Sequence, residues 1–169
     1  GIPADVVESA PGRGNLVARL RGNGKARPLL LMAHSDVVSV EREKWTRDPF
    51  GGEVVDGKVW GRGAVDTKGL VACELGVMLL LRRLEIPLER DVIFAVFADE
   101  EAGGQFGACW MWQNRRDLID AEFAINEGGG MALTLGSQRF YLCQTGEKGA
   151  ARLRLIARGE PGHASMPIP

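Results

Sequence analysis

The sequence predicts an α/β fold in which a mainly parallel β-sheet carries helices on both of its faces. Strand-like apolar runs alternate with helix-like segments over the first two-thirds of the chain, which is typical of a parallel sheet covered by helices. Three of the runs, residues 28–33, 92–98 and 121–126, are followed at once by acidic or histidine-containing segments. Because ligands bind beyond the carboxyl ends of the strands in such sheets, we expect the functional residues at that edge.

The individual elements follow from the spacing of apolar residues. Alternating or continuous apolar runs predict strands, and longer periodic segments bounded by caps or prolines predict helices. We expect strands over residues 15–21, 28–33, 92–98, 121–126, 131–135, 138–144 and 150–158, a hairpin over 53–60, and helices over 67–85 and 105–118.

Three of these predictions concern pairing and burial. Residues 15–21 and 28–33 are expected to form a hairpin, because a tight turn at 22–24 follows the first of them. The hairpin over 53–60 is expected to turn at its Asp-Gly sequence. The helix over 67–85 is expected to begin after Thr67 as its N-cap and to be largely buried, because apolar residues surround most of it.

Composition excludes several classes of function. The 21 Lys and Arg residues nearly balance the 22 Asp and Glu residues, so no basic surface for nucleic acid or an anionic membrane is expected. No apolar run reaches the ~18 residues that a membrane-spanning helix needs. The three cysteines form no CxxC pair, which favours free buried thiols and a reducing, cytoplasmic location.

One histidine and several acids at the predicted sheet edge are candidates for a metal site. A histidine among carboxylates, without clustered cysteines, fits zinc, manganese or cobalt in a two-metal hydrolytic site. A further acid must then take the proton of the attacking water. The candidates are His34 and Asp36 after the first strand, Glu100 and Glu101 after the second, Glu127 after the third, and Asp66 before the first helix.

Each candidate also has a simpler interpretation. The acids could form a solvated loop, His34 and Asp36 a plain hydrogen bond, and Asp66 a helix cap. Of Glu100 and Glu101, one could bind metal and the other act as the base, and their spacing does not distinguish the two. A nucleotide site is disfavoured, because Asp66 stands where a dinucleotide-binding loop has its third glycine.

Five motifs in this order resemble those of the M20 metallopeptidases. They are His34-Ser35-Asp36-Val37-Val38, Gly61-Arg62-Gly63-Ala64-Val65-Asp66-Thr67-Lys68-Gly69, Asp99-Glu100-Glu101-Ala102-Gly103-Gly104, Asn126-Glu127-Gly128-Gly129 and Gly162-His163-Ala164-Ser165-Met166-Pro167. Glu127, together with Glu147-Lys148-Gly149, is similar to the aminoacylase-1 and carboxypeptidase S branch of that family.

The resemblance implies a role for each candidate residue. Two zinc ions are implied for a complete active site, with cobalt or manganese possible in their place. The implied ligands are His34, Asp66 and Glu127 for the first zinc and Asp66 and Glu101 for the second, with Asp66 bridging the two and followed by a cis peptide bond. The implied catalytic residues are Glu100 as general base, Asp36 behind His34, and His163, which reaches the active site of a neighbouring subunit from a lid domain.

The resemblance also implies an architecture and an activity. Residues 1–145 would form the N-terminal part of a zinc-peptidase-like αβα sandwich, and residues 146–169 would begin a truncated lid (dimerisation) domain. Family members are longer and add a late histidine ligand, so this chain is expected to be an N-terminal fragment that hydrolyses little by itself. The implied parent is a homodimer that hydrolyses an amide bond next to a free carboxylate, in an N-acyl amino acid or a peptide. The alternative is a non-catalytic metal-binding or interaction module of the same fold.

Overall fold

The computed structural model describes residues 1–128, 130–146, 149, 151, 153–160, 162–163 and 165–166 of the chain. Contacts within the chain divide it into two units, Gly1–Glu127 and Gly128–Pro169. The assignment of residues 1–145 and 146–169 to a catalytic and a lid domain stays a prediction.

The first unit contains a five-stranded sheet, a two-stranded hairpin and three α-helices. The second unit contains one further hairpin among its described residues. The elements of the first unit are β1 (Ala4–Ala10), β2 (Arg13–Leu20), β3 (Leu29–His34), the 3₁₀ turn η1 (Arg42–Lys44), β4 (Glu53–Val55), β5 (Lys58–Trp60), α1 (Lys68–Arg83), β6 (Val92–Phe97), the 3₁₀ turn η2 (Glu100–Ala102), α2 (Ala108–Asn114), α3 (Arg116–Ile119) and β7 (Phe123–Ile125); those of the second are β8 (Ala132–Leu135) and β9 (Gln138–Tyr141).

The main sheet is mixed, so the prediction of a mainly parallel sheet was wrong. Its strand order is β1-β2-β6-β3-β7, with β3 parallel to β6 and β7, and with β1–β2 and β2–β6 antiparallel. The predicted hairpin of β2 with β3 was also wrong, because β6 lies between them. All six residues of β6 are buried, and this apolar strand takes the central place in the sheet. The edge strand β1 was not predicted, since most of its residues are exposed and polar residues interrupt its apolar ones.

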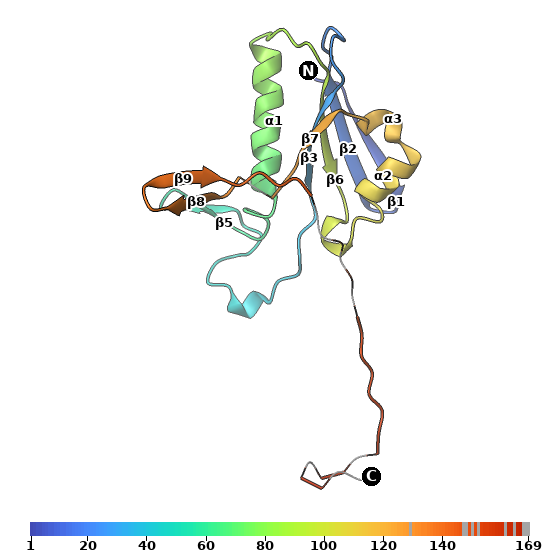
Figure 1. Ribbon diagram of the computed structural model, residues 1–169, viewed down its shortest axis with the longest axis vertical. Coiled ribbons are helices and arrows are strands. Elements are labelled where there is room, and N and C mark those ends of the chain that lie inside the picture. The colour runs from blue at the N-terminus through green and yellow to red at the C-terminus, as the bar shows by residue number, and fades with distance from the viewer. Residues whose placement is uncertain are drawn as a thin grey trace. The chain divides into compact units, whose positions relative to one another are not determined.

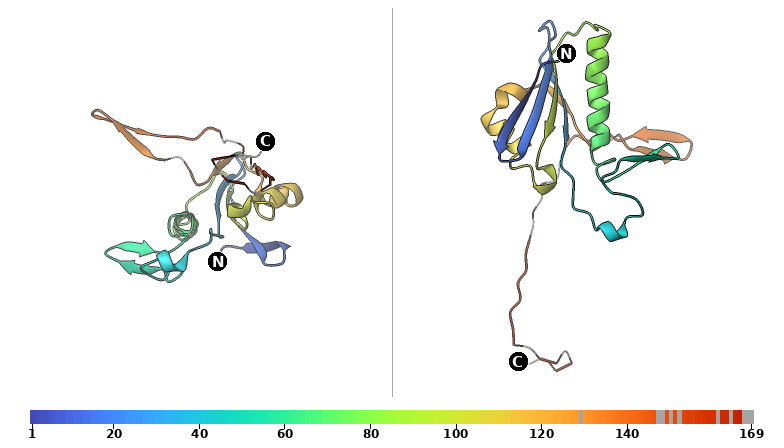
Figure 2. Two further views of the ribbon diagram at one scale, coloured as in Figure 1. Left: turned by 90° about the horizontal axis from the view of Figure 1, so that it is seen from below. Right: turned by 180° about the vertical axis from the view of Figure 1, so that it is seen from behind.

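Helices cover both faces of this sheet (Figures 1 and 2). On one face, Met78 of α1 packs with Leu31 and Phe94. On the other face, Met111 of α2 and Ile119 of α3 belong to a second buried cluster. Neighbouring residues of β3 and β6 point alternately into these two clusters, as the pleat of a strand requires.

Helix α1 is much more exposed than predicted. Only Glu74 and Met78 are buried, and Leu80 is 56% exposed. The sheet covers one side of the helix only, so the apolar side chains on its other sides are left uncovered within the first unit. Thr67 stands at the predicted N-cap position, but its side chain makes no capping hydrogen bond.

Several smaller predictions can also be compared with the structure. The Asp56-Gly57 hairpin is confirmed as β4 and β5, and the helix predicted over 105–118 is divided into α2 and α3 at Arg115. The three cysteines are free, as predicted, but exposed rather than buried. The described residues of the predicted strand over 150–158 form no strand, and Ala150 and Arg152 lie outside the described residues. No helix in the described part of the chain is both long and apolar enough to cross a bilayer.

Candidate metal centre

Strand register brings the predicted site residues to one edge of the sheet. His34, the last residue of β3, pairs with Phe97, the last residue of β6. The chain that leaves β6 therefore carries Glu100 to the same edge. Strand β7 is also parallel to β3 and ends at Ile125, two residues before Glu127. Parallel pairing of these three strands is the reason that residues far apart in sequence meet here.

Three carboxylates converge on one nitrogen of His34. The Nε2 atom lies 3.0 Å from Asp66 Oδ1, 3.4 Å from Glu127 Oε2 and 3.8 Å from Glu100 Oε2. One candidate ligand atom from each of His34, Asp66 and Glu127 can be chosen so that all three lie within 4.8 Å of one another. A small cavity of about 40 Å³ is lined by His34, Glu100 and Glu127, among other residues.

The imidazole of His34 is fixed by its other nitrogen. The ring is buried, and Nδ1 lies 3.0 Å from the backbone carbonyl oxygen of Asp36. An Nδ1–H donated to that carbonyl leaves the lone pair of Nε2 directed at the carboxylates, which is the arrangement of a metal-binding histidine. Burial lowers the pKa of His34, but the hydrogen bond to the Asp36 carbonyl, the charge of Glu127, the hydrogen bond to Asp66 and the charge of Glu100 outweigh it, and the pKa is raised.

Among the carboxylates that converge on His34, Glu100 has a shifted pKa. Burial raises its pKa, the nearby His34 lowers it, and the negative charges of Glu127, Glu101 and Asp36 raise it further, so that the pKa lies above its ordinary value. Mutually repelling carboxylates around an imidazole nitrogen are stabilised by a proton or by a cation. One neutral imidazole with carboxylate oxygens is a donor set that suits zinc, cobalt or manganese. The residues therefore fit a divalent metal ion.

The loop before α1 delivers Asp66 to this group. Gly63 has a left-handed backbone (φ 82°), and a Cβ there would lie 2.6 Å from Val37 Cγ1. At Gly69 a Cβ would lie 2.7 Å from the Ala64 carbonyl oxygen, so the loop packs directly on the first turn of the helix. The peptide bond between Asp66 and Thr67 is cis, as the resemblance implied.

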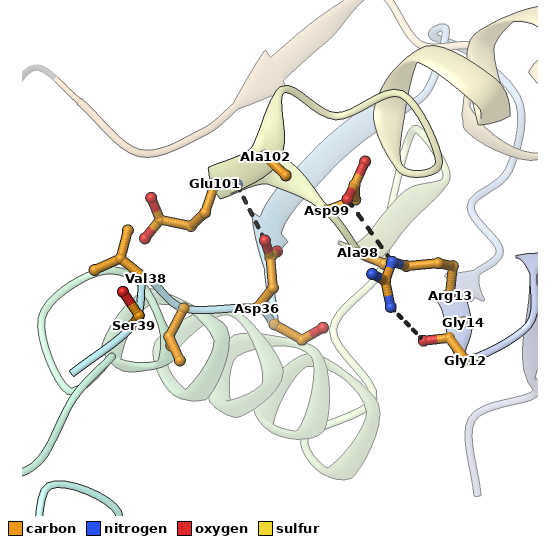
Figure 3. A pocket seen from close by; sticks show the side chains of 12 residues that line it. Gly12, Arg13, Gly14, Asp36, Val38, Ser39, Ala98, Asp99, Glu101 and Ala102 are labelled. Carbon is orange, nitrogen blue, oxygen red and sulfur yellow. Dashed lines mark hydrogen bonds and ion pairs between the residues drawn. The ribbon is translucent and has the colours of Figure 1, made fainter.

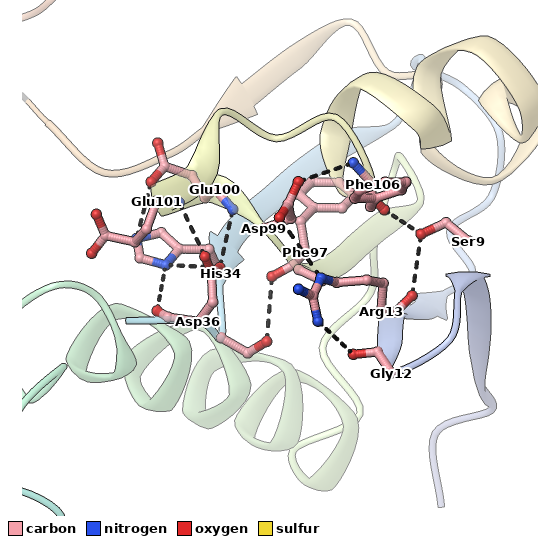
Figure 4. A network of polar contacts seen from close by, with 12 residues as sticks. Ser9, Gly12, Arg13, His34, Asp36, Phe97, Asp99, Glu100, Glu101 and Phe106 are labelled. Carbon is pink, nitrogen blue, oxygen red and sulfur yellow. Dashed lines mark hydrogen bonds and ion pairs between the residues drawn. The ribbon is translucent and has the colours of Figure 1, made fainter. Parts of the chain in front are cut away.

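The carboxylate of Asp36 makes contacts that differ from the prediction (Figure 4). The resemblance places Asp36 behind His34, but its Oδ1 atom lies 3.6 Å from His34 Nδ1, farther than the Asp36 carbonyl. Its two oxygens instead accept the backbone N–H groups of Glu100 (3.1 Å) and Glu101 (3.0 Å). Asp36 therefore joins the end of β3 to the turn that carries both glutamates.

Glu101 lies beside a larger, open cavity (Figure 3). The cavity has a volume of about 530 Å³, and Asp36, Asp99 and Arg13 also line it. The guanidinium of Arg13 is 3.7 Å from Asp99. The carboxylate of Glu101 is not a member of the group formed by His34, Asp66 and Glu127.

His163 belongs to the second unit. Its Nδ1 atom lies 2.9 Å from the hydroxyl oxygen of Ser165, and its backbone oxygen accepts the N–H of Met166. Its predicted role in a neighbouring subunit stays a prediction.

Asn15 is a polar residue near the site that the sequence interpretation missed. Its side chain is fully buried in β2 and hydrogen-bonds to the chain on both sides of the Glu100–Glu101 turn. The sequence feature that could have pointed to Asn15 is its place as a single amide just before the apolar run over 16–18.

Comparison with known proteins gives one consistent set of relatives. Residues 30–162 match the model of peptidase family M20/M25/M40. A succinyl-diaminopimelate desuccinylase of Cereibacter sphaeroides is 33% identical over 90% of this chain, and a probable carboxypeptidase S-like protein of Dictyostelium discoideum is 34% identical over 83%. An N-fatty-acyl-amino acid synthase/hydrolase of Xenopus tropicalis is 35% identical over 83% of the chain.

Solved structures are similar over most of the chain. An M20 family metallo-carboxypeptidase from Sulfolobus solfataricus has a TM-score of 0.63 and 30% identity over 78% of this chain and 29% of its own. Human carnosine dipeptidase 1 has a TM-score of 0.61 over 75% of this chain and 29% of its own, and at 24% identity it indicates the fold alone. The chain spans 40% of the desuccinylase and 28% of the carboxypeptidase S-like protein.

Proposed function

Because the chain belongs to peptidase family M20/M25/M40, we propose that the protein carrying it is a metal-dependent hydrolase of an amide bond next to a free carboxylate. The names of the relatives, a desuccinylase, a carboxypeptidase-like protein and an acyl-amino acid hydrolase, support N-acyl amino acids or short peptides as substrates. The observation that carries the proposal is the convergence of Asp66, Glu127 and Glu100 on the buried imidazole of His34.

In this proposal His34, Asp66 and Glu127 hold one divalent ion, and Asp66 and Glu101 hold a second. Zinc is the expected metal, with cobalt and manganese as alternatives that the same donors accept. A divalent cation supplies Lewis acidity toward a carbonyl oxygen and lowers the pKa of water. The Asp36 carbonyl keeps the His34 ring oriented, and the Asp36 carboxylate holds the turn of Glu100 and Glu101.

Glu100 is proposed to move the proton. It takes a proton from the attacking water and later gives it to the nitrogen of the leaving amine. A raised pKa suits this exchange, because a base works best when its pKa is close to the working pH. His163 is proposed to reach the site of a neighbouring subunit from a lid domain that begins after residue 145, so the active protein would be a homodimer.

Replacing Glu100 with Gln in the whole protein that carries this chain tests the proposal directly. Turnover of N-acyl amino acids should fall by roughly 10²- to 10⁴-fold, as is usual when a general base is removed. Metal content should stay close to that of the wild type, because Glu100 is not proposed as a ligand. Glu101→Gln, the matched change at the next residue, should lower metal content as well as activity. Hydrolysis rates and metal analysis of the same preparations are the measurements.

The substrate panel separates the alternatives. Each N-acyl amino acid is paired with its methyl ester, which lacks the free carboxylate, and the acid should be hydrolysed much faster. Metal bound by a protein that hydrolyses neither compound would favour the non-catalytic metal-binding module. Loss of metal together with activity in Glu100→Gln would mean that the base and the ligand have been assigned to the wrong glutamates.

A further inference from the structure

The loop over residues 98–107 carries both Glu100 and Glu101, and its two ends lie against each other. A Cβ at Gly107 would overlap the carbonyl oxygen of Ala98, so the chain closes there more tightly than any side chain allows. Asp99, the first residue after Ala98, has a left-handed backbone (φ 67°). The positions of the two glutamates therefore depend on how this closed loop is held.

One buried side chain of β2 hydrogen-bonds to both ends of the loop. Asn15 is fully buried, and its Oδ1 atom accepts the N–H of Ala98 at 3.1 Å while its Nδ2 atom donates to the carbonyl of Phe106 at 3.0 Å. The ladder between β2 and β6 runs from Leu20 to Leu16, and the Asn15 side chain continues it by one further bond to the chain beyond β6.

Neighbouring polar groups support this closure (Figure 4). The hydroxyl of Ser9 also donates to the carbonyl of Phe106, and the carboxylate of Asp99 accepts the N–H of Phe106 at 3.2 Å. At the tip of the loop, Asp36 accepts the N–H groups of the two glutamates. The loop is thus held at its base from β1 and β2 and at its tip from the end of β3.

We propose that Asn15 is a positioning residue for Glu100 and Glu101. Its carboxamide is the one group among the described residues that bonds to both ends of the loop by donating to one and accepting from the other. The rival interpretation is that Asn15 only stabilises the irregular pairing of β1 with β2. Its contacts with Val7 and Ser9 are 3.4 Å long, however, and both are longer than the two bonds to the loop.

The two hydrogen bonds from the Asn15 side chain to Ala98 and Phe106 are called the Asn15 clasp below. The substitution Asn15→Asp tests this role because it changes one atom of the clasp. Aspartate keeps the acceptor for the Ala98 N–H but places a second oxygen against the Phe106 carbonyl, so one bond becomes a repulsion. Asn23→Asp is the matched control. Asn23 is exposed, and within the described part of the chain its side chain bonds only through Oδ1, which accepts the N–H of Lys25 at 3.0 Å.

Amide hydrogen exchange, measured by NMR on the metal-free chain, shows how firmly the clasp holds the loop and does not require catalytic activity. In Asn15→Asp the amides of Glu100 and Glu101 should exchange at least about tenfold faster, the effect expected from losing one buried hydrogen bond. The amide of Phe94 in the central strand should keep its wild-type rate, and Asn23→Asp should leave all three unchanged. Equal acceleration at Phe94, or no acceleration at the glutamates, would contradict the proposal.

Steady-state kinetics on the whole protein that carries this chain then test whether the clasp affects the reaction, and this measurement rests on the proposed function. With an N-acyl amino acid, Asn15→Asp should lower kcat roughly tenfold or more and leave KM within about threefold, because the proton-transferring group is misplaced and the substrate contacts are not. A loosened loop with an unchanged kcat would overturn the positioning role. A wild-type protein that hydrolyses nothing would instead overturn the proposed function, and the exchange result would stand by itself.

Ser9→Ala provides a milder second variant if Asn15→Asp does not fold. It removes the other donor to the Phe106 carbonyl and leaves Asn15 in place. Exchange at Glu100 and Glu101 should rise by roughly threefold or more, with Phe94 unchanged. Unchanged exchange at the two glutamates in Ser9→Ala would count against the clasp.

Discussion

Two buried titratable side chains, His34 and Glu74, differ greatly in the polar groups that surround them. His34 has a carbonyl on one nitrogen and carboxylates near the other. Glu74 is buried in the middle of α1, and neither of its oxygens has a hydrogen-bond partner of ordinary geometry among the described residues. Burial raises the pKa of Glu74 to about 7, and the nearby backbone of Met32 offsets only part of that effect.

The raised pKa of Glu74 predicts that stability falls as the pH rises. In the unfolded chain this carboxyl loses its proton near pH 4.5, whereas in the folded chain it keeps the proton until about pH 7. The folded state therefore binds more protons between these values, and the free energy of unfolding decreases across that range. A difference of this size is worth about 3 kcal/mol, at about 1.4 kcal/mol for each pH unit between the two values.

Replacing Glu74 with Gln should remove this dependence. Relative to the wild type, Glu74→Gln should gain up to about 3 kcal/mol of unfolding free energy at pH 8 and little or nothing at pH 5. Urea unfolding at the two pH values, with a chelator present, is the measurement. Comparing the two proteins cancels the titration of His34, which is common to both. An equal difference at pH 5 and pH 8 would mean that Glu74 is not protonated in the folded state.

At the level of single residues, the sequence predicted which side chains lie at the site better than it predicted their hydrogen-bond partners. The acids and the imidazole were identified because they follow apolar strands, a pattern that can be seen in the sequence alone. The bonds of Asp36 to two backbone N–H groups were not predictable, because they depend on the path of the loop after β6. The role of Asn15 was missed for the same reason, since both of its loop partners are backbone groups.

Among the elements, α1 and the glycine loop before it determine where Asp66 lies. Lys68 N–H bonds to the carbonyl of Gly63, and Gly69 leaves no space for a Cβ beside Ala64. The start of the helix and the loop therefore form one packed unit. Farther along the same helix, Gly76 has open space around the position of a Cβ.

The two glycines of α1 should respond in opposite ways to alanine. Gly69→Ala should destabilise the chain by about 1 to 3 kcal/mol, because the added methyl group meets a backbone oxygen. Gly76→Ala should stabilise it by about 0.5 to 1 kcal/mol, because alanine favours the helix and nothing obstructs it. Urea unfolding measures both. A stabilising Gly69→Ala would show that the loop does not pack on the helix as described.

Element types were more predictable than element pairing. The Asp56-Gly57 hairpin and the strand at residues 92–97 follow from local residue preferences, and both are present. The place of β6 between β2 and β3 depends on contacts between segments more than 60 residues apart, about which local patterns say nothing. The burial of α1 was overestimated because apolar side chains show that a helix face is suited to burial. They do not show whether another element packs against that face.

Over the whole first unit, the parallel strands β3, β6 and β7 account for the site. Their shared direction brings His34, Glu100 and Glu127 to one edge, and the loop before α1 adds Asp66. This convergence was predicted from strand ends alone, although the sheet as a whole is mixed. Strands β1 and β2, which pair antiparallel beyond β6, contribute none of these four side chains.

The central claim is that this convergence binds a divalent metal ion. Crystals of the chain soaked with zinc and measured at the zinc absorption edge test it most directly. We expect an anomalous peak about 2.0 to 2.2 Å from His34 Nε2 and from carboxylate oxygens of Asp66 and Glu127. A peak on the exposed cysteines alone, or no peak beside the His34 imidazole, would contradict it.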